Sequence, residues 1–260
     1  CACGHGMQDC GLWPQVMRRM RVDPIEAPYA LRLGYGIAKI GDARRTSSLY
    51  RMLTRPKIAM KYYRLRYNLS FLSPFESGFD TGVRNTLEVY DRVRELTGKS
   101  IVVDSSKHYV RAASIYLSRP EQTRVVILVR DGRGVFYSGL KRNFGRAYSL
   151  QAWRNHYARA LELLERRVPE THRILIRYED MVSNTEQTLS RLCEFLGVEF
   201  EPAMLNFRAA VHHNVNGNDM KFSSTSELRL DEAWKTGLKA DDLAYFERRA
   251  GSLNRRLGYT

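Results

Sequence analysis

Two short apolar runs, which alternate with helical patterns along the chain, constrain this fold more than any other feature. They are Arg124–Val129 and Arg173–Arg177, and both are rich in Val, Ile and Leu. Each has the length and composition of a buried strand rather than a helix. A third run, Ser100–Asp104, reads SIVVD and is expected to be another short buried strand. Because strands that alternate with helices form βαβ units, we predict an α/β fold with a central parallel sheet flanked by helices.

Apolar residues at helical spacing predict helices between and around these strands. One helix carries Ser138 and follows the strand expected at Arg124–Val129. Another should open on a capping box of Ser183 and Glu186 and run to about Leu196, with Gly197 as its stop. The remaining expected helices are Trp13–Met20, Thr81–Thr97, Tyr109–Leu117, Leu150–Arg167 and Asp241–Leu257.

The chain is strongly basic, and this bears on its partners. Its 260 residues carry a formal net charge of +14, which favours polyanionic partners such as nucleic acid or a phosphorylated or sulfated ligand. Residues 44–75 interleave Arg and Lys with Tyr, a pattern that suits single-stranded nucleic acid. The same pattern suits amphipathic helices whose basic stems cover their own core, and we favour that interpretation. No apolar stretch approaches the ~20 residues that a membrane-spanning helix needs.

Three cysteines crowd the start of the chain. Cys1, Cys3 and Cys10 lie in CACGHGMQDC, with His5 among them. Zinc sites built from sequence-adjacent ligands usually have better-separated pairs. We therefore expect a loop with free thiols or one disulfide, with zinc as the less favoured alternative.

Polar residues follow all three expected strands. The strand ends read Asp104–Lys107, Arg130–Asp131 and Arg177–Asp180. Because ligands of parallel α/β folds bind at the carboxyl ends of the strands, these residues should converge on one site.

Arg130 and Ser138 are the strongest candidates within that site. The guanidinium of Arg130 offers a planar fork for phosphate, and the helix that begins near Gly132 should present free N–H groups to an anion. Ser138, eight residues after Arg130, adds a hydroxyl donor. The sequence therefore predicts a phosphate site, against the alternative that Arg130 pairs with Asp131 and Ser138 packs on a helix.

Two glycine motifs do not belong to nucleotide loops. TGKS at Thr97–Ser100 lacks the earlier glycine of a P-loop, since Val93 stands there, and it follows a helix instead of a strand. We expect Gly98 to end that helix and Lys99 to be a surface residue. DGRGVFY breaks the dinucleotide-binding pattern, because Tyr137 occupies the third glycine position.

At these residues the chain resembles the sulfotransferases that use 3′-phosphoadenosine 5′-phosphosulfate (PAPS). LVRDGRGVFYS is similar to their 3′-phosphate-binding segment, in which an arginine at a strand end and a serine eight residues later grip that phosphate. Further segments resemble the family in its own order along the chain: CACGHGMQDCGLW, VVDSSK, IRYEDMV, LSRLCEFLGVEFEP, HHNVNGNDMKF, LDEAW and RRLGY. VVDSSK is similar to bacterial-type and carbohydrate-type members.

The resemblance implies a P-loop-NTPase-like three-layer fold and one sulfotransferase domain over 1–260. Within it, 25–80 is expected to be a variable helical insertion near the acceptor site. The family begins with a strand and a turn that binds the 5′-phosphosulfate, and no residue here matches them. The chain is therefore expected to lack that first strand and loop, and a molecule that begins at Cys1 is expected to lack activity.

The resemblance also implies which residues hold the donor. Arg130 and Ser138 bind the 3′-phosphate, and Tyr178 lies near the adenine, with core packing as its alternative role. The remaining implied donor residues are Ser105, Ser106, Gly217, Asn218 and Lys221. The last three belong to a lid, where Lys221 replaces the usual arginine. Ser105 and Ser106 have an alternative role as caps of the helix that begins near Tyr109.

The implied reaction is in-line transfer of a sulfuryl group from PAPS to a hydroxyl or amine, with adenosine 3′,5′-bisphosphate as the product. Lys107 is expected to stabilise the leaving phosphate. His108 is expected to be the base, with a surface histidine as the alternative. Asp104 is the rival base, and its alternative role is to pair with a cation or to cap the next helix. No metal is required, so His212 and His213 are not expected to be ligands.

Two other functions compete with this one. A nucleic-acid-binding protein would explain the charge, and a P-loop kinase-like phosphotransferase would share the fold. We expect the acceptor to be a small molecule, carbohydrate or lipid, with no nucleic acid as a partner. A cytoplasmic location is expected, and the Golgi lumen is the alternative if an N-terminal anchor precedes the chain.

Overall fold

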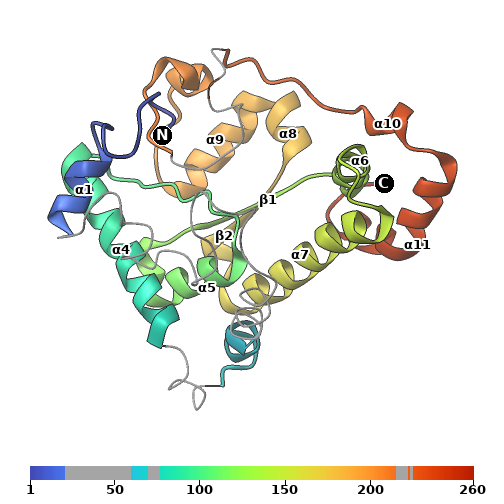
Figure 1. Ribbon diagram of the computed structural model, residues 1–260, viewed down its shortest axis with the longest axis horizontal. Coiled ribbons are helices and arrows are strands. Elements are labelled where there is room, and N and C mark those ends of the chain that lie inside the picture. The colour runs from blue at the N-terminus through green and yellow to red at the C-terminus, as the bar shows by residue number, and fades with distance from the viewer. Residues whose placement is uncertain (21–59, 70–76, 215–221, 223–224) are drawn as a thin grey trace. The chain divides into compact units, whose positions relative to one another are not determined.

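The computed structural model describes residues 1–20, 60–69, 77–214, 222 and 225–260 (Figure 1). They form two compact units. The first consists of Cys1–Pro120 with Phe207–Thr225, and the second of Glu121–Asn206 with Ser226–Thr260. The prediction of one domain over 1–260 stays a prediction. Most of the predicted insertion at 25–80 lies outside the described residues, although 60–67 form a helix.

The first unit is helical. It contains α1 (Trp13–Arg19), α4 (Ser77–Thr97) and α5 (Tyr109–Ser118), and α4 packs against both of the others. The amphipathic pattern of α4 explains this arrangement, because one part of its apolar stripe meets α1 and another meets α5. The buried residues of the two contacts are Val16, Met17 and Val89 on one side and Val83, Leu87 and Ile115 on the other.

The second unit contains a parallel pair of strands. β1 (Val125–Val129) and β2 (Arg173–Arg177) run parallel, with Val125 opposite Arg173 and Val129 opposite Arg177. Helices α6 (Gly132–Lys141) and α7 (Arg146–Arg167) form the crossover between them. The predicted α/β class, with a parallel sheet and these two strands, is therefore confirmed.

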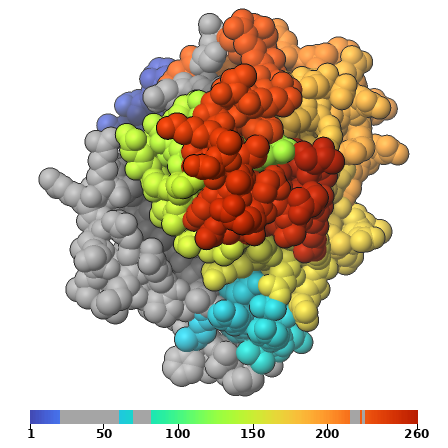
Figure 2. Space-filling view, turned by 90° about the vertical axis from the view of Figure 1, so that its right-hand side faces the viewer, coloured from blue at the N-terminus to red at the C-terminus, as the bar shows by residue number. Residues whose placement is uncertain are grey.

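The remaining helices of this unit follow β2. They are α8 (Tyr178–Ser183), α9 (Thr185–Leu196), α10 (Trp234–Gly237) and α11 (Ala240–Arg256). Elsewhere in the described chain, short 3-10 segments span Pro120–Gln122, Glu170–His172 and Pro202–Ala209. Figure 2 shows α11 and the C-terminus, in red, at the surface of the unit, and α11 packs on both α6 and α7.

An aromatic core joins α6, α7 and α11. The ring centroid of Phe246 lies 5.8 Å from that of Phe136 and 5.7 Å from that of Trp153. All three side chains are buried. A Cβ at Gly132 would lie 2.6 Å from Phe246 Cζ and 2.7 Å from Trp153 Cζ2, so only glycine fits where α6 begins.

The predicted strand at Ser100–Asp104 is wrong. These residues form no ladder, and the sheet seen in the described part of the chain has two strands. Ile101 is 40% exposed and Val103 is 82% exposed, so the segment is not buried either. The reason is that an apolar run becomes a strand only beside a partner edge, and no described segment pairs with this one.

Two smaller expectations also need correction. Val126 and Leu128 are exposed, so β1 is buried on one face only. The capping box at Ser183 does not form, because Ser183 is the last residue of α8 and the backbone leaves the helical region at Asn184. Gly197 does end α9, in the left-handed conformation with φ 70°.

The TGKS segment behaves as predicted. Gly98 has φ 65° and its N–H donates to the carbonyl of Arg94, which ends α4. Lys99 is exposed. Among the described helices, none has the length and apolar character needed to cross a membrane.

Candidate functional site

Arg130 and Tyr178 meet at the carboxyl end of the sheet. The last paired residues of the two strands are Val129 and Arg177, so Arg130 and Tyr178 leave the strands at the same level. The guanidinium carbon of Arg130 lies 4.7 Å from the ring centroid of Tyr178. This is a cation–π contact, and it holds the guanidinium beside the tyrosine ring.

A segment near the C-terminus closes over this pair. Arg130 Nη2 donates to Asp231 Oδ2 at 2.9 Å and to the Asp231 carbonyl at 3.1 Å. The Tyr178 hydroxyl donates to the Arg229 carbonyl at 3.1 Å and accepts from the Asp231 N–H at 3.3 Å. The hydrogen bond from Arg130, supported by the N–H of Ala233, lowers the pKa of Asp231. An anion that reaches Arg130 therefore meets a carboxylate already bound to one edge of the guanidinium.

Helix α6 brings Ser138 to the same side as Arg130. The Arg130 guanidinium lies over Gly134, where a Cβ would be 3.5 Å from Nε and also 3.2 Å from Trp234 Cδ1. Gly134 and Ser138 are four residues apart on α6 and so lie on one face of the helix. Ser138 is half-buried. The 3.5 Å to Nε is an ordinary van der Waals distance, so the guanidinium packs on the helix face that carries the serine.

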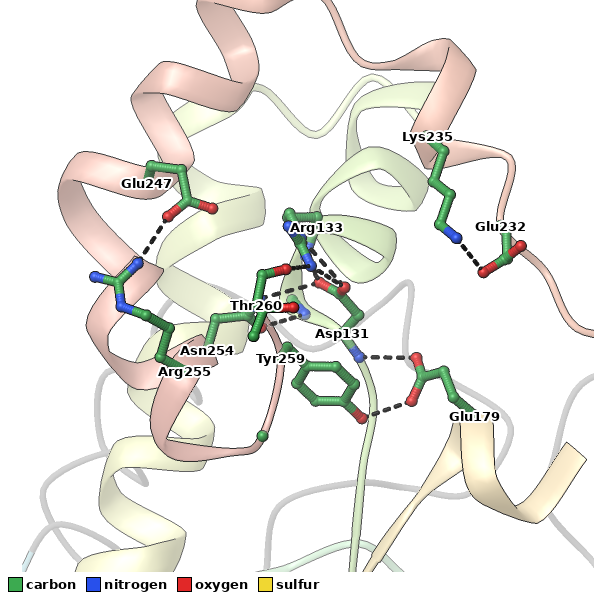
Figure 3. Close-up of polar contacts among 12 residues, drawn as sticks. Asp131, Arg133, Glu179, Glu232, Lys235, Glu247, Asn254, Arg255, Tyr259 and Thr260 are labelled. Atoms are coloured by element: carbon green, nitrogen blue, oxygen red, sulfur yellow. Dashed lines mark hydrogen bonds and ion pairs between the residues drawn. The ribbon is translucent and has the colours of Figure 1, made fainter. Parts of the chain in front are cut away.

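The first two N–H groups of α6 are not free to bind an anion, which corrects the expectation that this helix start presents free N–H groups. The Gly132 N–H donates to Asn254 Oδ1 at 2.9 Å, and the Arg133 N–H donates to Asp131 Oδ1 at 2.9 Å (Figure 3). The alternative prediction, an ion pair between Arg130 and Asp131, is also wrong. Asp131 forms its ion pair with Arg133, at 2.7 Å, while Arg130 pairs with Asp231.

Figure 3 shows how the strand end is locked to the C-terminus. Glu179 accepts from the Asp131 N–H at 3.1 Å and from the Tyr259 hydroxyl at 2.6 Å. Arg133 Nη2 donates to the Thr260 carbonyl at 2.7 Å. Burial and the hydrogen bond to Glu179 raise the pKa of Tyr259, so its hydroxyl stays a donor at neutral pH.

The sequence did not single out Asn254 or Asp231, and Glu179 was expected only as one of the polar residues that follow the strand at Arg173–Arg177. Asn254 lies 122 residues from the amide that it accepts from, and no local pattern marks such a pair. Asp231 and Tyr259 fall inside the quoted segments LDEAW and RRLGY, which were the available signals.

Asp104 lies in the first unit and is held by three groups. It pairs with Arg111 at 3.1 Å, accepts from the Ser106 N–H at 2.8 Å, and accepts from the Tyr90 hydroxyl. Burial alone would raise the pKa of Asp104, but Arg111, Tyr90 and Ser106 outweigh it and lower the pKa below its usual value. A carboxylate in this state accepts a proton poorly near neutral pH.

Lys107 and His108 follow in the irregular segment before α5. Lys107 is exposed and has φ 60°, a left-handed conformation that is uncommon for a residue with a side chain. His108 is half-buried, occupies the N-cap position of α5, and its ring stacks near that of Tyr109, with 5.9 Å between centroids.

Ser105 and Ser106 do not cap α5, so their alternative role is wrong. Both are exposed, and His108 stands at the N-cap without a side-chain cap. Gly217, Asn218 and Lys221 lie outside the described residues. Arg130, Ser138 and Tyr178 thus belong to the second unit, and Asp104 to His108 belong to the first.

Comparisons with known proteins give the family. A family model described as "Sulfotransferase family" matches residues 48–202. A solved structure, "Sulfotransferase Domain from the Curacin Biosynthetic Pathway", is similar at 20% identity and a TM-score of 0.48, over 77% of this chain and 78% of that one. No curated protein matches. Because the family model spans more than half of the chain, this protein belongs to the sulfotransferase family.

Proposed function

We propose that the protein transfers a sulfuryl group from PAPS to a hydroxyl acceptor, and that Arg130 and Ser138 bind the 3′-phosphate of this donor. One observation carries the proposal. Arg130 is held at the strand end by Tyr178, with its guanidinium over the face of α6 that carries Ser138.

The residues at this strand end fit a phosphate. Arg130 uses Nη2 for Asp231, and a guanidinium has five N–H groups, so further donors serve an anion. The Ser138 hydroxyl adds a donor from the same side. The Arg130 guanidinium covers one face of the Tyr178 ring, and we propose that a nucleobase stacks on the other face.

PAPS, when bound, supplies the sulfuryl group and carries the leaving phosphate. Lys107 provides the positive charge that stabilises that phosphate. The acceptor proton goes to His108 rather than to Asp104, because the ion pair with Arg111 weakens Asp104 as a base. Nδ1 of His108 is buried, so Nε2 is the nitrogen that we propose accepts the proton.

A calorimetric titration tests the phosphate assignment. Adenosine 3′,5′-bisphosphate, adenosine 5′-monophosphate and adenosine 3′-monophosphate are each titrated into the chain. Arg130→Ala should abolish the preference for the bisphosphate over the 5′-monophosphate, a loss of about 10- to 100-fold for a charged hydrogen-bonded contact. Lys107→Ala should instead abolish the preference for the bisphosphate over the 3′-monophosphate.

Arg124→Ala is the matched control. Arg124 is exposed just before the other end of β1, so this variant removes one positive charge without touching the strand end. It should bind all three nucleotides as the native chain does. A native chain that shows no preference for the 3′-phosphate, or an Arg124→Ala variant as impaired as Arg130→Ala, would contradict the proposal.

A further inference from the structure

Four ligand atoms from opposite ends of the first unit converge on one point. The Sγ atoms of Cys1, Cys3 and Cys10 and a ring nitrogen of His213 all lie within 4.8 Å of one another. Cys10 is 3% exposed, and the other three are half-buried. The sequence favoured free thiols or one disulfide, because the three cysteines form no separated pairs. The fourth member comes from a segment 203 residues after Cys10.

The separations match a tetrahedral metal site better than a disulfide. Cys1 Sγ lies 3.6 Å from Cys10 Sγ, and His213 Nδ1 lies 3.2 Å from Cys10 Sγ and 4.0 Å from Cys1 Sγ. Tetrahedral zinc with its usual bond lengths places ligand atoms roughly 3.5 to 3.8 Å apart. A disulfide needs about 2.05 Å between sulfurs.

Contacts outside the four ligands hold the cluster together. The Trp13 indole N–H donates to the His213 carbonyl at 2.7 Å, and the Ala2 N–H donates to the Asn214 carbonyl at 2.8 Å. Gly4, with φ 86°, turns the chain directly after Cys3. These hydrogen bonds join the N-terminal segment to the segment around His213 through the carbonyls of His213 and Asn214, so they hold the two segments together without occupying a ligand atom.

We propose that Cys1, Cys3, Cys10 and His213 bind one structural Zn²⁺ ion. Three thiolates and an imidazole are the ligand set that zinc takes in closed, four-coordinate sites. Such a site leaves no position for substrate, so the ion fastens the N-terminal loop to the segment around His213. That segment leads, four residues later, to Gly217, the first of the three predicted lid residues.

Metal analysis of the purified chain tests this site directly. The native chain should contain one zinc ion per molecule after dialysis against metal-free buffer. Replacement by Co²⁺ should give the visible absorption of tetrahedral cobalt together with a thiolate charge-transfer band. Cys10→Ser and His213→Ala should lose most of the zinc, whereas His213→Cys should retain it because a fourth thiolate can replace the imidazole.

Two control variants lie outside the cluster. Cys193→Ser changes the fourth cysteine, whose sulfur donates to Met204 in the second unit, and His212→Ala changes the neighbouring histidine, which contacts the Phe207 carbonyl. Both should keep a full complement of zinc. A native chain without zinc that also gives no cobalt–thiolate band would overturn the proposal, as would a disulfide between Cys10 and Cys1 or Cys3 found by peptide mapping of the native chain.

Discussion

The guanidinium of Arg130 rests 4.7 Å from the centre of the Tyr178 ring, and the two residues follow paired positions of β1 and β2. The register of the sheet therefore sets the contact, and the tyrosine ring orients the arginine that we propose binds phosphate.

Replacing Tyr178 should separate the roles of its ring and its hydroxyl. Tyr178→Ala removes the cation–π contact, worth about 1 kcal/mol, and should weaken binding of adenosine 3′,5′-bisphosphate about fivefold. Tyr178→Phe keeps the ring and should bind as the native chain does, while losing the hydrogen bonds to Arg229 and Asp231. Titration calorimetry measures both variants, and equal losses of affinity would contradict the proposed role of the ring.

The left-handed backbone conformation of Lys107 should lower the stability of the chain when residue 107 has a side chain. Lys107→Ala and Lys107→Gly both remove the amine, but only glycine adopts φ 60° without strain. We expect the glycine variant to be more stable than the alanine variant by about 1 kcal/mol. Urea unfolding measures the difference. An alanine variant of equal or greater stability would show that this conformation carries no such cost.

The ion pair of Asp104 should make stability depend on acid pH. Its pKa is lowered in the folded chain, so its contribution is complete well above the usual value of 3.8 and is lost as the pH falls below that value. Asp104→Asn should therefore lower the free energy of unfolding by about 2 kcal/mol at pH 6 and by less at pH 3. Urea unfolding at both pH values measures the change.

Asp91→Asn is the matched control for this variant. Asp91, on α4, pairs with Arg119, the residue directly after α5, and both side chains are about a third exposed. Its cost should stay below about 1 kcal/mol at pH 6. An Asp104→Asn variant that loses no more than Asp91→Asn would contradict the expectation.

Tyr259 should make stability depend on alkaline pH. Burial and Glu179 raise its pKa in the folded chain, so its contribution is complete below the usual value of 10 and is lost as the pH rises above it. Tyr259→Phe should lower the free energy of unfolding by about 1 to 2 kcal/mol at pH 7, because Glu179 loses a hydrogen-bond donor. This loss, measured by urea unfolding, should become smaller above pH 10. Tyr148→Phe, at an exposed site, should change little in either condition. A Tyr259→Phe cost independent of pH would exclude this role.

The elements near the site could be predicted because local patterns specify them. The apolar runs gave β1 and β2, and Gly98 and Gly197 gave two helix ends. Ser100–Asp104 failed because strand formation depends on a neighbouring edge, which a single run of residues does not reveal.

The contacts that join distant segments could not be predicted in this way. Asn254 occupies the first amide of α6 from 122 residues away, and Asp231 reaches Arg130 across 101 residues. Neither pair has a spacing that a helix or strand period would mark. The position of Arg130 at a strand end was therefore predictable, whereas the partners that orient it were not.

The cluster at the start of the chain also has a consequence for the order of synthesis. Cys10 and His213 are 203 residues apart. At translation speeds of about 5 to 20 residues per second, on the order of 10 to 40 s separate their emergence from the ribosome. Throughout that interval the N-terminal thiols exist without their histidine, while both strands of the parallel pair are made. The first unit to be started is thus completed only after the sheet of the second unit has been synthesised.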